Sequence, residues 1–322
     1  MAAVAVHQFA QCITCHAWSP DHSMVAFCPN NNEVHIYKLL EDKWEKVHVL
    51  QKHDQIVSGI DWSRRSNRIV TVSHDRNSWV SKLIRKKHDS SVTSVAWHPN
   101  NILLATTSTD GKCRVFSTFI KGVDTRESKT GSSSDSKFGE QIVQLDLSFS
   151  WAFGVKWSPS GNTLAYVGHN SMIYFVDDVG PSPLAQNVAF RNLPLRDVLF
   201  FSEKMVIGVG FDCTPMVFAA DESGIWSFIR FLGERKASSS GPKYGSQFSE
   251  AFGKLYGQSK HGLSNDTVEP SRIRGAIHEN CINCIVPLRK EGFRTKRFST
   301  SGLDGKVVIW DLENYEDLSD YV

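Results

Sequence analysis

A short segment that ends in tryptophan recurs along the 322-residue chain at a countable spacing. Four copies share it: ITCHAWSP at 13–20, VSGIDWSR at 57–64, VTSVAWHP at 92–99 and AFGVKWSP at 152–159. An Asp or Asn follows each tryptophan after 13 positions, in the pairs Trp18 and Asn31, Trp62 and Asp75, Trp97 and Asp110, and Trp157 and Asn170. Leu199 and Asp212 repeat this spacing, and Asp304 marks a last unit. The chain therefore contains six copies of one structural unit.

Each unit has the pattern of a small antiparallel sheet. Runs rich in β-branched residues are separated by Asn, Asp and Gly turns, and a further run precedes the next unit. An apolar side chain recurs six positions after the turn residue, at Tyr37, Phe116, Val176, Phe218 and Trp310. A ring of such sheets covers both faces of each one and leaves only short outer edges. We therefore predict an all-β propeller with six recognisable repeats, formed as one domain by residues 1–322.

The second unit departs from the pattern. Ser81 stands where the other units have an apolar residue, and only 13 positions separate Asp75 from His88. The segment RNSWVSKLIRKK at 76–87 would have to supply two strands, for which it is too short. The sequence predicts that about one repeat, roughly 40 to 45 residues, is absent between Ser78 and Trp79. It also predicts a poorly sealed seam at residues 76–90.

Two polar insertions interrupt the repeats. Residues 124–140 are predicted to be a mobile loop, and residues 233–277 a longer insertion between blades. Within the second, Phe248, Ala251, Phe252, Leu255 and Tyr256 follow helical spacing, so a short amphipathic helix is expected near 247–256. A closed ring offers this helix no obvious core. Its apolar stripe is therefore predicted to bind a partner, the alternative being that it packs on the side of the propeller.

The composition argues against several classes of function. Lys and Arg total 36 against 34 Asp and Glu, which is not the clustered basicity that nucleic acids select. No apolar run of about 18 residues and no export signal are present, so membrane insertion is not expected and the chain is predicted to be soluble and intracellular. No phosphate loop, nucleophile elbow or paired-metal motif occurs. We predict no catalytic activity and no cofactor.

Paired cysteines raise a zinc alternative. CITC at 12–15 and CINC at 281–284 have the spacing of metal ligands. Both segments read as strands, in which residues three positions apart point to opposite faces, so one pair cannot easily hold one ion. The two segments belong to the first and last units, which a ring brings side by side. We predict that no metal is bound.

The last unit, LDGKVVIWD at 303–311, resembles the WD repeat. In WD blades a His, a Ser or Thr and the turn Asp form a hydrogen-bonded network. That resemblance implies that two pairs fix turns: His53 with Asp75, and His88 with Asp110. Asp304 and Trp310 occupy repeat positions of the last unit. The alternative, that these His and Asp residues form an acid–base pair, is less favoured.

Longer segments give a more specific resemblance. ITCHAWSPDHSMVAFCPNNNEVHIY at 13–37, NRIVTVSHDRNS at 67–78 and VAWHPNNILLATTSTDGKCRVFS at 95–117 are similar to the family of WD-repeat subunit 1 of the actin-related protein 2/3 complex. That family is a seven-bladed, non-catalytic propeller in an assembly that nucleates branched actin filaments in the cytoplasm. This chain departs from it after DRNS, where the family continues with the rest of that blade and one further blade.

The resemblance implies a scaffold that holds other subunits, including the actin-related proteins, and contacts the actin filament. The family's insert carries a projecting helix that touches actin-type surfaces, and the matching positions here are Phe248, Phe252, Leu255 and Tyr256. The alternative is an adaptor of another complex, such as a ubiquitin-ligase substrate receptor. Such receptors have an Arg two positions after the closing Trp-Asp, where this chain has Glu313.

Overall fold

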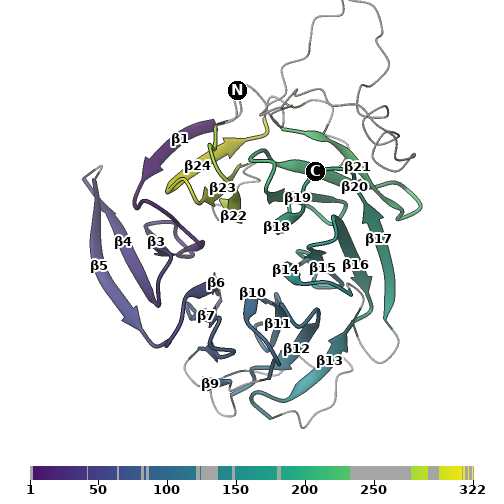
Figure 1. Ribbon diagram of the computed structural model, residues 1–322, viewed down its shortest axis with the longest axis horizontal. Helices are drawn as coiled ribbons and strands as arrows, with labels where there is room; N and C mark the ends of the chain where they lie inside the picture. The colour runs from purple at the N-terminus through teal and green to yellow at the C-terminus, as the bar shows by residue number, and fades with distance from the viewer. Residues whose placement is uncertain are drawn as a thin grey trace, which may run out of the picture. The chain divides into compact units, whose positions relative to one another are not determined.

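Strands make up almost all of the regular structure that is described (Figure 1). The computed structural model describes residues 3–41, 43–63, 65–80, 83–84, 87–120, 124, 137–146, 149–179, 183–232, 277–288, 297–313, 315, 318 and 321. Within them lie six antiparallel sheets of four strands each. The predicted all-β propeller with six repeats is thereby confirmed.

The first three blades follow one another in the chain. Blade 1 contains β2 (Cys15–Trp18), β3 (Met24–Cys28), β4 (Glu33–Leu40) and β5 (Lys43–Gln51). Blade 2 contains β6 (Val57–Trp62), β7 (Ile69–Ser73), β8 (Ser78–Trp79) and β9 (Leu83–Ile84). Blade 3 contains β10 (Val92–Trp97), β11 (Leu103–Ser108), β12 (Cys113–Ser117) and β13 (Gln141–Leu145).

The other three blades include one that the two ends of the described chain share. Blade 4 contains β14 (Ala152–Trp157), β15 (Thr163–Gly168), β16 (Met172–Asp177) and β17 (Leu184–Ala189). Blade 5 contains β18 (Leu195–Phe200), β19 (Met205–Gly210), β20 (Met216–Ala220) and β21 (Trp226–Phe231). Blade 6 contains β22 (Ile282–Leu288), β23 (Arg297–Gly302), β24 (Lys306–Asp311) and β1 (Ala3–Gln8).

Strand β1 closes the ring. It pairs antiparallel with β24, from Ala3 opposite Trp310 to Gln8 opposite Lys306, and so forms the outer strand of blade 6 (Figure 1). Phe9, directly after β1, packs against Phe27 of blade 1 at 5.3 Å between ring centroids. The first residues therefore join the last blade to the first one.

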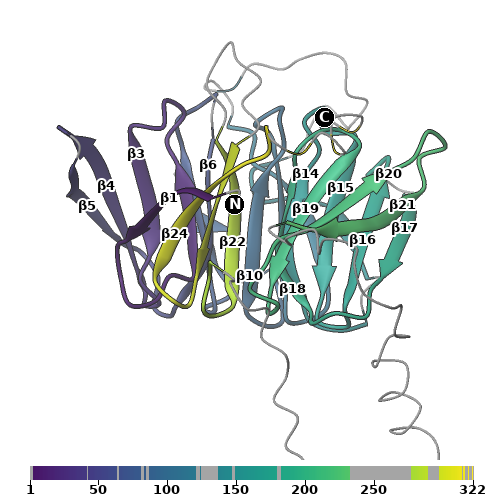
Figure 2. The same ribbon diagram turned by 90° about the horizontal axis from the view of Figure 1, so that it is seen from above.

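The core lies between the blades. The innermost strand of each blade contacts the innermost strand of the next, around a central axis (Figure 1), and Figure 2 shows the strands running between the two faces of the ring. Each cluster of buried apolar residues combines neighbouring blades, as where Phe175 of blade 4 stacks on Trp226 of blade 5 at 3.9 Å. A single sheet with two apolar faces is stable only because its neighbours bury both of them.

The innermost strands approach so closely that large side chains are excluded at some positions. Gly154 in β14 lies directly against β18, and a Cβ atom there would stand 2.3 Å from the Cα of Asp197. Gly59 in β6 is similarly placed, since its Cβ would stand 3.1 Å from the Cα of Ser94 in β10. Both glycines lie three positions before the repeated tryptophan.

Blade 2 carries the irregularity that the sequence indicates. Strands β8 and β9 have two residues each, and β8 pairs with β7 only through Trp79 opposite Thr71 and Ser78 opposite Val72. The inner half is nevertheless closed, since β6 lies against β10 and Ile84 joins valines of both blades in one buried cluster. Within the predicted seam at 76–90, Ile84 is thus buried between the two blades. The shortage of residues falls on the two outer strands.

Most of both predicted insertions lies outside the described residues. Of 124–140, Asp124 and residues 137–140 are described, and the Asp124 carboxylate accepts a hydrogen bond from Arg68 Nη2 at 3.1 Å. Of 233–277, including the helix expected near 247–256, only Ile277 is described. Among the described residues, no helix is long and apolar enough to cross a bilayer.

Candidate functional site

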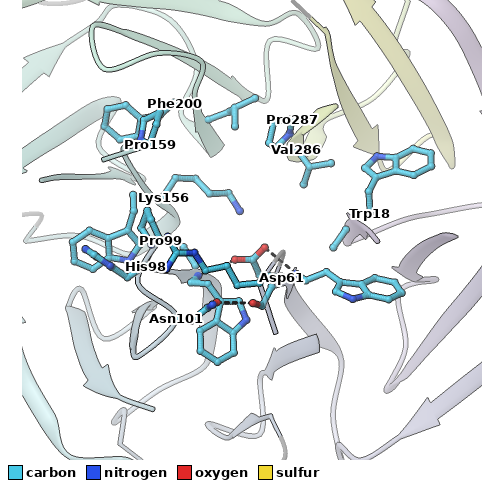
Figure 3. A pocket seen from close by; sticks show the side chains of 18 of the residues that line it. Trp18, Asp61, His98, Pro99, Asn101, Lys156, Pro159, Phe200, Val286 and Pro287 are labelled. Carbon is cyan, nitrogen blue, oxygen red and sulfur yellow. Dashed lines mark hydrogen bonds between the residues drawn. The ribbon is translucent and has the colours of Figure 1, made fainter. Parts of the chain in front are cut away.

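A cavity opens where the six innermost strands end (Figure 3). Its volume is about 350 Å³, and every blade contributes to its wall at the equivalent point of its repeat. The contributions are Trp18, Trp62, Trp97 and Trp157 in blades 1 to 4, Phe200 in blade 5, and Val286 and Pro287 in blade 6. The repeated tryptophan of the sequence thus lines one mouth of the central channel.

Two aspartates of the innermost strands join neighbouring blades through the backbone. Asp61 of β6 accepts hydrogen bonds from the N–H groups of Trp62 (2.9 Å) and of Trp97 in the next blade (2.8 Å). Asp197 of β18 does the same for Val198 (2.9 Å) and for Ile285 in blade 6 (3.0 Å). A carboxylate that accepts two backbone hydrogen bonds fixes the offset between two strands that share no ladder.

Polar side chains four positions before the repeated tryptophan make a second set of links between blades. In each, a side chain donates to a backbone carbonyl of the following blade: Thr14 to Val57 (2.8 Å), Ser58 to Val92, Thr93 to Ala152 (2.6 Å) and, at the matching place in blade 6, Asn283 to Ile13 (2.9 Å). These residues were not predicted from the sequence. The signal was visible, since a hydroxyl residue stands at this offset in ITCHAW, VSGIDW and VTSVAW.

Asp61 gives a test of the join between blades 2 and 3. We expect Asp61→Ala to lower the free energy of unfolding by about 1 to 3 kcal/mol, because the buried N–H groups lose their acceptor. We expect Asp61→Asn, whose amide oxygen still accepts, to lose less. Urea unfolding followed by tryptophan fluorescence measures both. Equal stability of Asp61→Ala and the unchanged chain would show that the carboxylate does not hold this join.

A lone ammonium group faces the same cavity. Lys156 of β14 points into it (Figure 3), and neither a hydrogen bond nor an ion pair within 4.0 Å is found for it among the described residues. Burial opposes its charge, but Asp197 and Asp61 outweigh burial and raise the pKa of Lys156. Two carboxylates around one ammonium leave this part of the channel without excess positive charge. The arrangement is therefore a poor site for an anion.

His16 of β2 connects blades 1 and 6 in the channel wall. The hydroxyl of Ser299 accepts the indole N–H of Trp18 at 2.8 Å, which leaves its own proton for His16 Nε2 at 2.9 Å. The Nδ1–H group of His16 then donates to Ser301 at 2.9 Å. Burial, with smaller contributions from Lys156 and His278, lowers the pKa of His16 to about 3. The folded protein therefore keeps this imidazole neutral.

The neutral state of His16 predicts a pH dependence of stability. The unfolded chain takes up a proton at His16 below its ordinary pKa of 6.5, whereas the folded chain does not until about pH 3. Stability from this group is thus present above pH 6.5 and falls with the pH, by up to about 1.4 kcal/mol per unit. We expect His16→Gln to flatten this part of the stability curve from pH 6 to pH 4, measured by urea unfolding. A matching change with His48→Gln, at an exposed position, would contradict this assignment.

Hydrogen-bonded networks occupy the predicted His and Asp positions. His53 lies 2.8 Å from both Asp75 and Thr71, and His88 lies 3.1 Å from Asp110 and 2.8 Å from Thr106. Each imidazole thus spans from the turn aspartate to a strand hydroxyl. The side chains of both pairs are largely buried.

The last blade carries the longest of these networks. His278, which our sequence analysis did not single out, lies 2.9 Å from Asp304 and 2.8 Å from the hydroxyl of Thr300. The indole N–H of Trp310 donates to the same hydroxyl at 2.8 Å. The Asp304 carboxylate accepts a hydrogen bond from the Nδ1–H group of His278, so Nε2 accepts one from the hydroxyl of Thr300. The four side chains thus fix β22, β23 and β24 relative to one another.

The predicted partner-binding residues Phe248, Phe252, Leu255 and Tyr256 lie outside the described residues. The cysteine motifs are described. Strand β2 begins at Cys15 and β22 at Ile282, so the expectation that both motifs lie within strands is wrong for Cys12 and Cys281. In the part of the chain that the structure describes, no three His, Cys, Asp or Glu side chains are grouped as metal ligands.

Comparisons with known proteins agree with the repeat. The family model for the WD domain, G-beta repeat, matches residues 44–78 and 79–117. The two matches meet between Ser78 and Trp79, where the sequence predicts the missing repeat. A chain in a solved structure titled "Crystal Structure of Mitotic Checkpoint Complex" matches 93% of this chain and 74% of its own length, with a TM-score of 0.59 and 14% identity. That likeness shows the fold alone.

Relatives over the whole length are more specific. Actin-related protein 2/3 complex subunit 1A of Arabidopsis thaliana is 66% identical, over 98% of both chains. Subunit 1A-A of Xenopus laevis is 33% identical over 97% of this chain and 98% of its own, and subunit 1 of Schizosaccharomyces pombe is 27% identical over 92% and 96%. The Arabidopsis alignment has 374 positions and this chain 322 residues, so at least 52 positions of the relative have no counterpart here. With a six-bladed WD propeller and this identity, the chain belongs to the family of actin-related protein 2/3 complex subunit 1.

Proposed function

We propose that this chain is a non-catalytic scaffold subunit of the actin-related protein 2/3 complex and supports the nucleation and branching of actin filaments. The observation that carries the proposal is 66% identity over 98% of both chains to subunits 1A and 1B of that complex in Arabidopsis thaliana. Its partners are the other subunits, including the actin-related proteins, and the actin filament. It acts in the cytoplasm, on the cytoskeleton, without nucleic acid or insertion into a membrane.

The insertion at 233–277 is the proposed contact to actin-type surfaces. Its apolar stripe, Phe248, Phe252, Leu255 and Tyr256, has the spacing of an amphipathic helix that lies in a partner's groove. The ring supplies the support for this insertion, and the repeat predicted to be missing after Ser78 falls in blade 2, whose outer strands have two residues each.

Affinity purification of the tagged chain from cell extract tests the proposal. Three forms are compared: the chain itself, a form with one repeat restored after Ser78, and a form with the four apolar insert residues changed to Ala. Co-elution of both actin-related proteins with the first form supports membership in the complex. If only the restored form brings them down, the scaffold role requires the seventh blade.

Filament assays separate scaffolding from contact with actin. We expect the four-alanine form to enter the complex and to produce fewer branches in a pyrene-actin and microscopy assay. Unchanged branching would contradict the role of the insert. Co-elution of ubiquitin-ligase subunits in place of actin-related proteins would favour the adaptor alternative.

A further inference from the structure

Four large apolar side chains are exposed together on the ring. They are Phe149, Trp151, Leu193 and Phe211, with exposed fractions of 92%, 55%, 54% and 38%. We call these four residues the aromatic platform. Burial of large apolar side chains in an interface contributes more binding free energy than polar contacts on an ordinary surface do. An exposed group of such side chains therefore marks an interaction site.

The topology puts all four on one face. Trp151 directly precedes β14, and Leu193 precedes β18, so both lie where innermost strands begin. Phe211 follows β19, the antiparallel neighbour of β18, and therefore lies at the same end. The tryptophan-lined cavity is at the opposite end of these strands. The aromatic platform is thus separate from the channel mouth described above.

His169 makes the aromatic platform continuous across blades 4 and 5. Its ring centroid lies 5.6 Å from that of Trp151 and 6.4 Å from that of Phe211. The N–H group of Phe211 donates to the Pro194 carbonyl at 3.3 Å, which holds the turn of blade 5 against the entry to β18. Phe149 has a φ of +44°, a backbone conformation that a phenylalanine rarely adopts.

A pocket beside the aromatic platform is acidic. Its volume is about 430 Å³, and Phe149, Trp151 and His169 line it together with Asp110 and Asp146. No lysine or arginine is among the described residues of its wall. Asp110 is engaged, because its carboxylate accepts from Arg114 at 2.7 Å in addition to His88.

Asp146 is the carboxylate left to a ligand. It is exposed, and no hydrogen bond or ion pair is found for it among the described residues. Indole and phenyl faces attract cations through the ring quadrupole, most strongly for arginine on tryptophan. A carboxylate beside two aromatic rings therefore favours a basic side chain and repels an acidic one.

We propose that the aromatic platform binds a linear peptide segment of a partner protein that carries an arginine or lysine flanked by apolar side chains. The basic side chain enters the pocket between Trp151 and Asp146. The flanking apolar side chains lie on Phe211 and Leu193. The proposal concerns a surface of the ring itself and does not depend on the insertion or on membership in any complex.

A fluorescence anisotropy titration of the purified full chain tests this surface. The probe is a fluorescein-labelled peptide, Gly-Ser-Leu-Arg-Phe-Ser-Gly, beside the same peptide with Glu in place of Arg. We expect the Arg peptide to bind at least about tenfold more tightly, since both the ring faces and the carboxylate discriminate. Asp146→Lys should remove that preference, and Trp151→Ala should weaken the Arg peptide about fivefold or more.

Two control variants lie on the opposite face of the ring. Asp178→Lys, after β16, repeats the charge change, and Ile225→Ala removes an apolar side chain that is 60% exposed. Both should bind the Arg peptide as the unchanged chain does. Thermal unfolding of every variant shows that the ring is intact. Any of three outcomes would overturn the proposal. These are equal binding of the Arg and Glu peptides, no binding of the Arg peptide at millimolar concentration, and an effect of Asp178→Lys equal to that of Asp146→Lys.

Discussion

Removal of residues 1–9 is expected to destabilise the ring more than any single substitution. The truncation takes away β1, so β24 loses its antiparallel partner over the register from Ala3 to Gln8. It also removes Phe9, which contacts Phe27 and lies 5.5 Å from Tyr37 and 5.6 Å from Trp44. The loss of a fully buried aromatic side chain costs about 3 to 5 kcal/mol, and the partly buried Phe9 contributes less than this, to which the lost strand hydrogen bonds are added. We expect the truncated chain to lose cooperative unfolding or to unfold at a much lower urea concentration.

A peptide supplied in trans provides the control. A synthetic peptide of residues 1–12 contains the strand and Phe9, and its addition to the truncated chain should recover part of the lost stability. Urea unfolding at several peptide concentrations measures this recovery, because a ligand of the folded state shifts the transition. An unchanged transition on truncation would mean that blade 6 is closed without its outer strand.

Gly154→Ala is expected to be the most damaging single substitution in the inner wall. The new Cβ atom would stand 2.3 Å from the Cα and 2.5 Å from the Oδ1 of Asp197, so backbone has to move. Movement of β18 also breaks the hydrogen bonds of Asp197 to Val198 and Ile285. We expect a loss of about 3 kcal/mol or more, since both overpacking and an unsatisfied buried carboxylate contribute.

A second glycine separates steric from conformational effects. Gly224 has a φ of +82° and nothing within 4 Å of its Cβ position. Gly224→Ala should therefore lose only about 1 to 2 kcal/mol, from the left-handed backbone alone. Differential scanning calorimetry of the two variants measures the contrast. Comparable losses would show that blades 4 and 5 can move apart at low cost.

The fold could be predicted because its signal repeats. The 13-residue offset to the turn residue identified five units, one of them starting from Leu199 instead of a tryptophan, and Asp304 with Trp310 identified the sixth. The role of the N-terminal segment was not predicted. Ala3–Gln8 carries no mark of its own, and its place is decided by the free edge of β24, which only the closed ring creates.

The contacts between blades were less predictable than the blades. Asp61 lies one position before Trp62, whereas Asp197 lies three positions before Phe200, so the two aspartates do not share a position in the repeat. Their shared role depends on which backbone N–H groups face them across the ring. A poorly sealed seam at residues 76–90 was predicted, because this segment is too short for two strands. The inner half is closed because Val72, Ile84 and Val95 belong to one buried cluster, and the innermost strands have their full length.

Strands β8 and β9, with two residues each, show that a propeller blade can form with very short outer strands. A WD repeat begins with the outer strand of one blade and ends within the next, so each blade draws on two repeats. Excision of a segment one period long returns the chain to the same phase, and every inner strand still meets a neighbour. The ring then has one blade fewer, and the outer strands of the blade at the excision are short. If a repeat is absent at this place, as the sequence predicts, proteins that bind the ring on both sides of it approach one another at a changed angle, and the blade count itself becomes a determinant of assembly.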